Sequence, residues 1–338
     1  MDSVEQLDEF MTRPGPELVQ WARGLDGDLL ILGVGGKMGP SLAQLALRAS
    51  REAGVERRVI GVSRFSDPEL EKALQAKGVE TIRADLSNPD DLARLPDVRN
   101  VVFMAGRKFG TTGNQALTWA MNVFMPGLVA QRFRNSRIVA FSTGNVYPLV
   151  PVTSGGATED TRPDPVGEYA QSTLGRERVF EHFSGVNGTP VTLIRLNYAI
   201  DLRYGVLLDV AQKVLDGEPI SVEMPAVNVI WQGDANAYVL RAFDLATSPP
   251  AVLNVTGPET VSIRWLATRF GEIFGKQPVF TGEEQPTAYL SNASRCFELF
   301  GYPRVPLLYM IRWVAHWLKT GGPTLAKPTH FDERKGQY

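Results

Sequence analysis

The chain has 338 residues, of which 43% are hydrophobic and 21% are charged, and its formal net charge is −2. This composition is typical of a globular protein, and the near-neutral charge argues against nucleic-acid and anionic-membrane partners. The single cysteine, Cys296, excludes an intramolecular disulfide, and three scattered histidines predict no metal site. The mixed opening segment and the lack of long apolar stretches predict a cytoplasmic protein without signal peptide or membrane span.

Short apolar runs alternate with helical patterns over the first part of the chain, which is typical of parallel β-α-β units. A buried strand is expected at Leu29–Leu32, and further strands in "RRVIGVSR", "VETIRA", "VRNVVFMAG", "SRIVAFST" and "PVTLIRL". Within the long helix "NQALTWAMNVFMPGLVAQRF", Pro126 predicts a kink or a break because proline has no N–H to donate. The pattern predicts an α/β fold with a doubly wound parallel sheet.

A glycine-rich turn follows the first strand. The segment "LLILGVGGKMGPSLAQLA" has the strand–turn–helix context in which glycines let a pyrophosphate approach the backbone and the helix N-terminus. We expect this turn to bind a dinucleotide through Gly33, Gly36, Lys37, Met38 and Gly39.

The end of the second strand bears on the choice of dinucleotide. NAD-binding proteins usually carry an acidic residue there, which binds the ribose hydroxyls. This chain has Ser63 and Arg64 instead, and a hydroxyl with a guanidinium suits a 2′-phosphate. NADP is therefore favoured over NAD, although Arg64 could also be an ordinary surface arginine.

Beyond about residue 200 the alternation is less regular, and helices are expected in "YGVLLDVAQKVLDGE", "DANAYVLRAFDLAT" and "SIRWLATRFGEIFG". We expect four parts. They are an N-terminal extension at residues 1–27, a Rossmann-type NAD(P)-binding domain at about 28–200, a smaller α/β substrate-binding lobe at 201–320, and a surface tail at 321–338.

These segments resemble, in order and spacing, the extended short-chain dehydrogenase/reductase family, its NAD(P)-dependent epimerase/dehydratase group. The resemblance covers about residues 28–318. Gly33, Gly36 and Gly39 match the G-x-x-G-x-x-G loop of that family, and four later segments are similar to its other motifs: "ADLSNP", "FMAG", "FSTGNVYP" and "RLNYAI".

The resemblance implies roles for particular residues. Adenine would lie beside Asp85 and Leu86, and the nicotinamide ribose over Met104, Ala105 and Gly106. Further cofactor contacts are implied at Asn122, Tyr169 and Asn197, and catalytic roles at Thr143 and Tyr169. Four of these residues also have a structural interpretation: a turn cap at Asp85, a satisfied amide at Asn122, a strand former at Thr143 and a packed aromatic at Tyr169.

One position departs from the family pattern. The helix "GEYAQSTLGRERVFEHF" should contain Tyr-x-x-x-Lys, but Tyr169 is followed four residues later by Thr173. In the family, the lysine ammonium lowers the pKa of the tyrosine. Arg176, one turn further along the helix, and Lys108, after the fourth strand, are candidates to replace it. Each could equally be a surface cation.

Three functions remain open. The favoured one is an NAD(P)-dependent oxidoreductase or epimerase/dehydratase acting on a sugar-like hydroxyl or ketone of a nucleotide sugar, free sugar or sugar acid. The second is a redox-inactive NADP(H)-binding sensor. The third is a non-redox lyase or isomerase that uses another base, such as Asp201 or Glu168.

Substrate contacts are expected from the second lobe and from the loop at residues 150–166. Four arginines are available for a diphosphate: Arg203, Arg241, Arg264 and Arg295. The helices at about 115–134 and 168–184 form a four-helix interface in relatives, and here they are unusually apolar. We therefore expect a homodimer.

Overall fold

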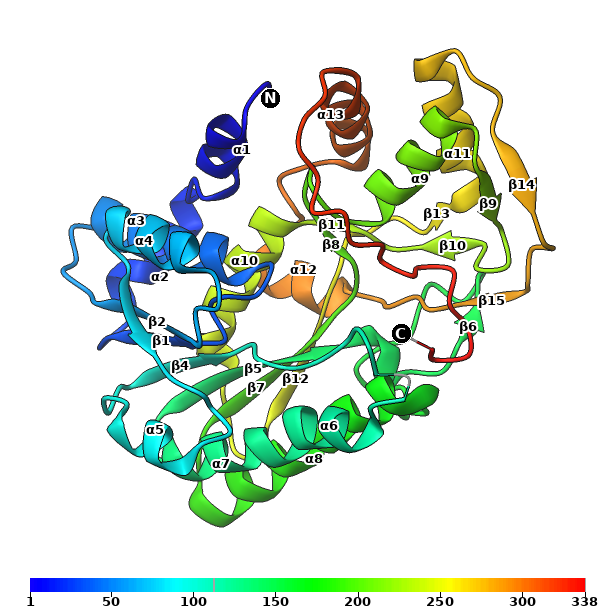
Figure 1. The fold of residues 1–338 in the computed structure, drawn as a ribbon. Helices are drawn as coiled ribbons and strands as arrows, with labels where there is room; N and C mark the ends of the chain where they lie inside the picture. The colour runs from blue at the N-terminus through cyan, green and yellow to red at the C-terminus, as the bar shows by residue number, and fades with distance from the viewer. Residues whose placement is uncertain (112, 338) are drawn as a thin grey trace.

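The computed structural model describes residues 1–111 and 113–337 and is built on a seven-stranded parallel sheet (Figure 1). The strand order is β12-β7-β5-β4-β1-β2-β3, as in a doubly wound fold. The strands are β1 Leu29–Leu32, β2 Val59–Ser63, β3 Glu80–Arg83, β4 Asn100–Phe103, β5 Arg137–Thr143, β7 Val191–Leu196 and β12 Ala251–Val255. The predicted fold class is confirmed. The sheet also includes β12, although this strand lies beyond residue 200, the expected end of the Rossmann-type domain.

Helices cover both faces of the sheet, as right-handed crossovers between parallel strands require. One face packs against α2 Pro16–Gly24, α3 Gly39–Glu52, α4 Pro68–Ala76 and α10 Gln232–Arg241. The other face packs against α5 Pro89–Arg94, α7 Met125–Arg132 and α8 Gly167–Asn187, with α6 Gln115–Trp119 alongside α8. Both layers are apolar, so the sheet is buried on its two sides.

The long helix predicted around Pro126 is interrupted. It consists of α6, a π-helical turn η1 at Ala120–Phe124, and α7. Proline at position 126 has no N–H to donate to the Asn122 carbonyl, so a regular α-helix cannot continue there. The prediction of a kink or a break is confirmed.

The second lobe is built from helices and two-stranded sheets. Its helices are α9 Val206–Asp216, α11 Ile263–Phe274, α12 Ser294–Phe300 and α13 Leu307–Lys319. The strand pairs are β8 Ala199–Ile200 with β11 Ile230–Trp231, β9 Pro219–Ser221 with β14 Val279–Thr281, β10 Ala226–Val227 with β13 Val261–Ser262, and β6 Val150–Pro151 with β15 Thr287–Ala288. Two 3-10 helices, η2 Gly144–Val146 and η3 Ala242–Leu245, complete the elements.

The N-terminal extension packs against both halves of the molecule. Leu7 and Met11 of α1 Val4–Met11 lie in the core of the second lobe, whereas Leu18 and Ala22 of α2 pack with the sheet. The extension therefore helps to fix the second lobe over the carboxyl edge of the sheet. None of the helices in the described part of the chain is long and apolar enough to cross a membrane.

We call residues 321–337 the C-terminal strap, because this segment runs back from α13 along the cleft between the two lobes (Figure 1). The Thr329 N–H and hydroxyl donate to Asp209 Oδ2 at 2.8 and 2.6 Å. The Phe331 side chain is buried in the core of the second lobe, and Arg334 donates to the Thr287 carbonyl. The segment expected as a surface tail is thus anchored at several points.

Candidate functional site

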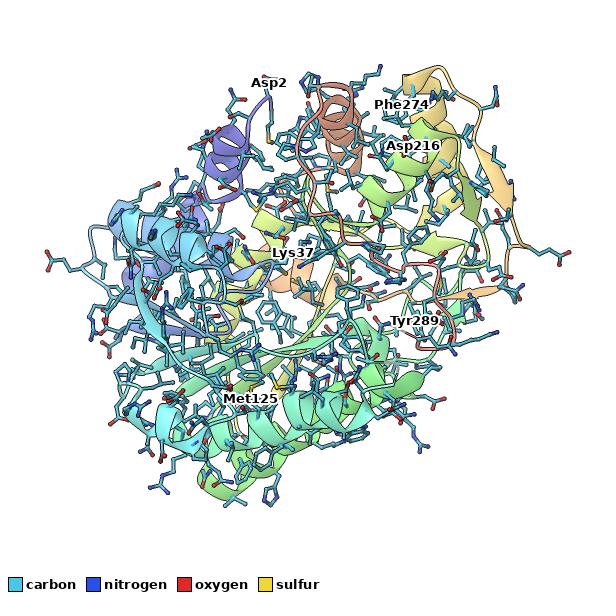
Figure 2. The ribbon with its side chains drawn as sticks, in the orientation of Figure 1. Asp2, Lys37, Met125, Asp216, Phe274 and Tyr289 are labelled. Carbon is cyan, nitrogen blue, oxygen red and sulfur yellow. The ribbon has the colours of Figure 1, made fainter. Side chains whose placement is uncertain are left out.

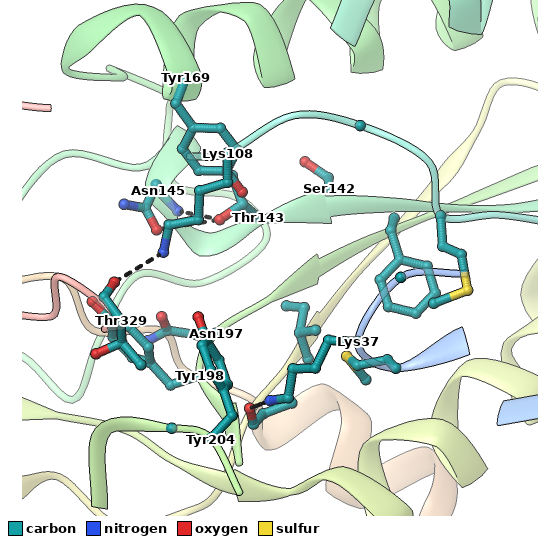
Figure 3. A pocket seen from close by; sticks show the side chains of 18 of the residues that line it. Lys37, Lys108, Ser142, Thr143, Asn145, Tyr169, Asn197, Tyr198, Tyr204 and Thr329 are labelled. Carbon is teal, nitrogen blue, oxygen red and sulfur yellow. Dashed lines mark hydrogen bonds between the residues drawn. The ribbon is translucent and has the colours of Figure 1, made fainter. Parts of the chain in front are cut away.

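A cavity of about 280 Å³ lies at the carboxyl edge of the sheet, between the sheet and the second lobe (Figure 3). This is where open α/β sheets bind their ligands. Its walls come from the glycine-rich turn, the loop after β4, the end of β5, α8, the segment after β7, the start of α9 and the C-terminal strap. Eight predicted site residues line it: Gly36, Lys37, Met38, Met104, Gly106, Thr143, Tyr169 and Asn197.

The glycine-rich turn fits a dinucleotide phosphate. Gly33 has a φ of +93°, and a Cβ there would lie 2.7 Å from the Ala105 nitrogen. A Cβ on Gly39 would overlap the Val34 carbonyl, so these two glycines shape the turn without lining the cavity. At Gly36 the surroundings are open, the nearest atom being the Gly33 carbonyl oxygen at 3.5 Å. The N-terminus of α3 has no side-chain cap; there the Gly39 N–H donates to the Gly36 carbonyl at 3.3 Å, and Pro40 has no N–H.

The residues predicted to hold the adenosine half lie along the same sheet edge but outside this cavity. Ser63 packs beside Gly35, and Arg64 is exposed. Asp85 Oδ1 accepts from the Ser87 N–H at 2.9 Å and from the Ser87 hydroxyl at 2.6 Å, as in a turn cap. These hydrogen bonds hold the pKa of Asp85 below its usual value. Leu86 is buried beneath.

Thr143 and Tyr169 meet at the cavity wall. Thr143 is the last residue of β5, and its hydroxyl donates to Asn145 Oδ1 at 3.2 Å. Burial raises the pKa of the Tyr169 phenol above its ordinary value. A hydrogen bond with Thr143, the charge of Arg176 and a hydrogen bond with Thr173 oppose this rise without cancelling it. Tyr169 is therefore a neutral phenol at pH 7.

Thr173, at the position where the family pattern has lysine, and Arg176 lie on the same helix as Tyr169. The Thr173 hydroxyl donates to the Tyr169 carbonyl within the helix, at 2.8 Å. Arg176 Nη1 donates to the Phe141 carbonyl at 2.9 Å, and its guanidinium packs so closely on Gly106 that a Cβ there would overlap it. Burial lowers the pKa of Arg176 to about 10, so it is charged at pH 7.

Asn122 lies behind the cavity and does not line it. Its Oδ1 accepts from the Arg107 N–H and from Arg176 Nη2, both at 2.8 Å. Its Nδ2 donates to the Arg107 carbonyl at 2.9 Å and to the Ser172 hydroxyl at 3.0 Å. The backbone carbonyl of Asn122, which Pro126 cannot bond, accepts from Arg176 Nε at 3.5 Å. In this structure both polar atoms of the Asn122 side chain are hydrogen-bonded within the protein, and the amide holds the guanidinium of Arg176 in place.

Two half-buried lysines face each other across the cleft. Lys37, in the glycine-rich turn, reaches the second lobe, where Nζ donates to the Ala199 carbonyl at 2.7 Å and lies 4.1 Å from the centre of the Tyr204 ring (Figure 2). Lys108 Nζ lies 3.5 Å from the Thr329 carbonyl and 5.8 Å from the centre of the Tyr169 ring (Figure 3). Burial lowers the pKa of each lysine to about 8.

Several lining residues were not predicted, and the strongest examples are Tyr198, Tyr204 and Thr329. Tyr198 has a φ of +38°, a conformation that side chains rarely adopt and that its sequence does not indicate. Thr329 belongs to the strap, whose polar composition indicated only a tail. Of the loop at residues 150–166, by contrast, no residue lines the cavity.

The alternative bases and the four arginines have other partners and do not line this cavity. Asp201 pairs with Arg203, and Glu168 accepts from the Trp119 ring nitrogen. Arg264 pairs with Glu284, whereas Arg241 and Arg295 donate to backbone carbonyls. Among the described residues, no three His, Cys, Asp or Glu side chains gather as metal ligands would.

Comparison with known proteins gives structural relatives alone, since no family model and no curated protein matches this sequence. UDP-glucuronic acid 4-epimerase from Bacillus cereus, with UDP-glucuronic acid and NAD, has a TM-score of 0.72 at 19% identity, covering 86% of this chain and 99% of that one. UDP-glucose 4-epimerase from Thermotoga maritima has a TM-score of 0.69 at 17% identity, and the match covers 87% of this chain and 99% of that one. dTDP-glucose 4,6-dehydratase from Streptomyces venezuelae, with NAD and TYD bound, has a TM-score of 0.72 at 18% identity, and the match covers 86% of this chain and 97% of that one.

The chain has the fold of the NAD-dependent sugar epimerases and dehydratases. The resemblance in sequence motifs agrees with this likeness in structure. Because the sequence identities are only 17–19%, the structural likeness establishes the fold alone. The activity has to be argued from the site itself.

Proposed function

We propose that this protein is an NAD(P)-dependent oxidoreductase or epimerase that acts on a hydroxyl or ketone of a sugar-like substrate. The observation that supports this proposal most directly is the hydrogen bond between Tyr169 and Thr143 at the wall of a cavity that the glycine-rich turn also lines. A bound nicotinamide cofactor would supply or accept the hydride. The chain's own residues then have to bind the substrate oxygen and move its proton.

Tyr169 is suited to donating that proton. A phenol whose pKa is raised remains protonated at neutral pH, so it can donate to a substrate oxygen that gains negative charge. The Thr143 hydroxyl is placed to bond the same oxygen. Arg176, which also lines the cavity, contributes positive charge to Tyr169 in place of the lysine. These properties favour reduction of a ketone over oxidation of an alcohol.

The preferred cofactor in this proposal is NADP. Ser63 and Arg64 stand at the end of β2, and neither would repel a 2′-phosphate as a carboxylate would. Lys37 at the N-terminus of α3 adds positive charge beside the open face of Gly36. Two of the three solved relatives named above contain NAD, so the choice between the two cofactors needs a direct titration.

Substitution of Tyr169 by Phe tests the function. We expect the variant to keep its affinity for NADPH but to reduce ketoses and keto sugars about 10²- to 10⁴-fold more slowly, because the proton donor is lost. NADPH oxidation over a carbonyl panel measures the rate, and cofactor fluorescence measures binding. Tyr302→Phe, at an exposed position, is the matched control.

An unchanged rate in Tyr169→Phe would exclude the proposed role of the tyrosine. If the wild-type protein binds NADPH but oxidises it with no carbonyl compound, the enzyme proposal fails and a redox-inactive NADP(H)-binding sensor replaces it. Turnover that persists after the cofactor has been stripped indicates a non-redox lyase or isomerase.

We also propose that the protein is a homodimer. The helices α6, α7 and α8 and the turn η1 form a surface groove of about 500 Å³, lined mostly by apolar side chains such as Val123, Phe124 and Phe183. Phe124 is 60% exposed, and Leu117 and Trp119 are also exposed. Such a patch is costly in water and suits a second copy of the same helices.

A further inference from the structure

The C-terminal strap divides the cleft between the two lobes into two cavities. The cavity beside Tyr169, called the inner cavity from here on, measures about 280 Å³ and has Thr329 in its wall. A second cavity of about 390 Å³, called the outer cavity, is lined by Pro328 and His330 of the strap and by Asp209 of α9, among other residues. Neighbouring residues of the strap therefore line different cavities, and the strap is the partition between them.

The partition reaches from one lobe to the other at Thr329, which is 2% exposed. Its N–H and hydroxyl donate to Asp209 Oδ2, on α9 of the second lobe, at 2.8 and 2.6 Å. Its carbonyl accepts from Lys108 Nζ, in the loop after β4 of the sheet, at 3.5 Å (Figure 3). One residue of the strap is thus bonded to both lobes across the cleft.

The strap is also fixed beyond this crossing. Phe331 is 2% exposed in the core of the second lobe, and Arg334 Nη1 donates to the Thr287 carbonyl of β15 at 2.7 Å. A Cβ on Gly336 would overlap the carbonyl of Val166, the residue before α8, so the end of the strap packs closely against the sheet domain. Displacing the strap would expose Phe331 and break these hydrogen bonds, so the partition is part of the fold.

The inner cavity leaves little space for a large substrate. Its lining includes Gly36 and Met104, where the nicotinamide half of the proposed cofactor would lie, so cofactor and substrate share its volume. Cavities that enclose drug-sized ligands usually measure about 300–1,000 Å³. The space that remains beside Tyr169 suits a molecule of one sugar ring. A longer ligand would have to continue into the outer cavity, and residues 328–330 of the strap stand between the two.

We propose that the substrate is a free sugar or sugar acid of about one ring, without a nucleotide, because the C-terminal strap closes the cleft behind Thr329. The proposal rests on the proposed function and narrows its substrate class. The solved relatives from Bacillus cereus and Thermotoga maritima contain UDP-glucuronic acid and UDP-glucose. The strap would therefore distinguish the substrate of this chain from the ligands of those two proteins.

Two pairs of ligands test the size limit: glucose with UDP-glucose, and glucuronate with UDP-glucuronate. Each ligand is titrated calorimetrically into the protein saturated with NADP⁺. We expect a free sugar to bind at least about 10-fold more tightly than its UDP derivative, because the nucleotide cannot enter without opening the strap. The proposal is overturned if either UDP derivative binds as tightly as its free sugar, or more tightly.

A matched pair of variants at Asp209 tests whether the strap sets this limit. Asp209→Ala removes the acceptor of both Thr329 hydrogen bonds, so we expect the strap to loosen and the discrimination against the UDP derivative to fall about 10-fold. Asp209→Asn keeps an acceptor oxygen at the same place and should keep the discrimination. If Asp209→Ala folds and discriminates as the wild-type protein does, the strap does not set the limit and the proposal fails.

Hydrogen exchange in the wild-type protein gives a test that needs neither a variant nor a bound sugar. We expect the peptide that contains Thr329 to exchange at least about 100-fold more slowly than an unstructured peptide, with and without NADP⁺. Exchange at the unstructured rate would overturn the proposal, since no fixed partition would exist, and this measurement decides if none of the four ligands binds. Neither binding nor exchange requires turnover, so failure of hydride transfer in the Tyr169 experiment would exclude the proposed function separately.

Discussion

At the scale of single residues, Thr173 places a neutral hydroxyl, instead of an ammonium, one helical turn from Tyr169. The tyrosine still faces the cavity and still bonds Thr143. Its nearest compensating charge is Arg176, which is fixed by carbonyl and amide oxygens. A guanidinium shared among such acceptors stabilises a phenolate less than an ammonium placed directly beside it. The lowering of the Tyr169 pKa by Arg176 is therefore smaller than the rise caused by burial, and the pKa lies above its ordinary value.

Restoring the lysine should reverse that balance. In Thr173→Lys, we expect the pKa of Tyr169 to fall, because an ammonium one helical turn away favours the phenolate. A proton donor is active below its pKa, so ketone reduction should begin to decline at a lower pH than in the wild-type protein. The pH dependence of kcat measures this, with Thr173→Met as the uncharged control. Identical profiles for wild type and Thr173→Lys would contradict it.

At the scale of elements, the π-helical turn connects three parts of the site. Asn122 lies in this turn and bonds the loop that carries Arg107, the helix that carries Ser172, and the Arg176 guanidinium. Loss of its amide would leave several buried polar groups without partners.

We therefore expect Asn122→Ala to lower the free energy of unfolding by about 2–4 kcal/mol, given a cost of about 1–3 kcal/mol for each buried group left unsatisfied. Urea denaturation measures this quantity. Asn114→Ala is the matched control, because the Asn114 side chain is exposed and bonds its own loop, at the Gly110 carbonyl. A loss below 1 kcal/mol in Asn122→Ala would show that the turn does not depend on the amide.

Sequence patterns predicted the elements whose structure depends on residues close together in the chain. The buried strands and the glycine-rich turn follow from short segments with recognisable periodicity or spacing, whereas the roles of Thr143 and Tyr169 were implied by the family resemblance. The edge strand β12 was missed because it joins β7 across more than fifty residues of chain, and nothing local indicates that pairing. The strap was missed for a similar reason, since Thr329 and Phe331 are buried by distant partners. A cofactor contact at Asn122 was implied by the family resemblance, with a structural amide as the alternative, and the π turn that orients its side chain could not be read from the sequence.

At the scale of the whole molecule, the apolar groove on α6, α7 and α8 is the surface that a second copy would cover. Phe124, in the interrupted helix, is one of the residues that line it. We expect Phe124→Glu to convert a dimer into a monomer, because a buried carboxylate without a partner is costly at an interface. Light scattering at micromolar concentration measures the mass. Tyr302→Glu, at an exposed position on the second lobe, is the control. A wild-type protein of monomer mass would exclude the dimer.

The π-helical turn also affects how this sequence should be aligned with others. A π turn closes each hydrogen-bonded ring with one residue more than an α-helix does, so Ala120–Phe124 is equivalent to a single-residue insertion into a regular helix. An alignment that places no gap there shifts every position on one side of the turn by about 100° around the helix axis. Residues such as Leu117 and Phe124 would then be compared with residues on the wrong helix face. An alignment of this chain with a sequence whose helix is regular should therefore place a one-residue gap in that sequence, opposite positions 120–124.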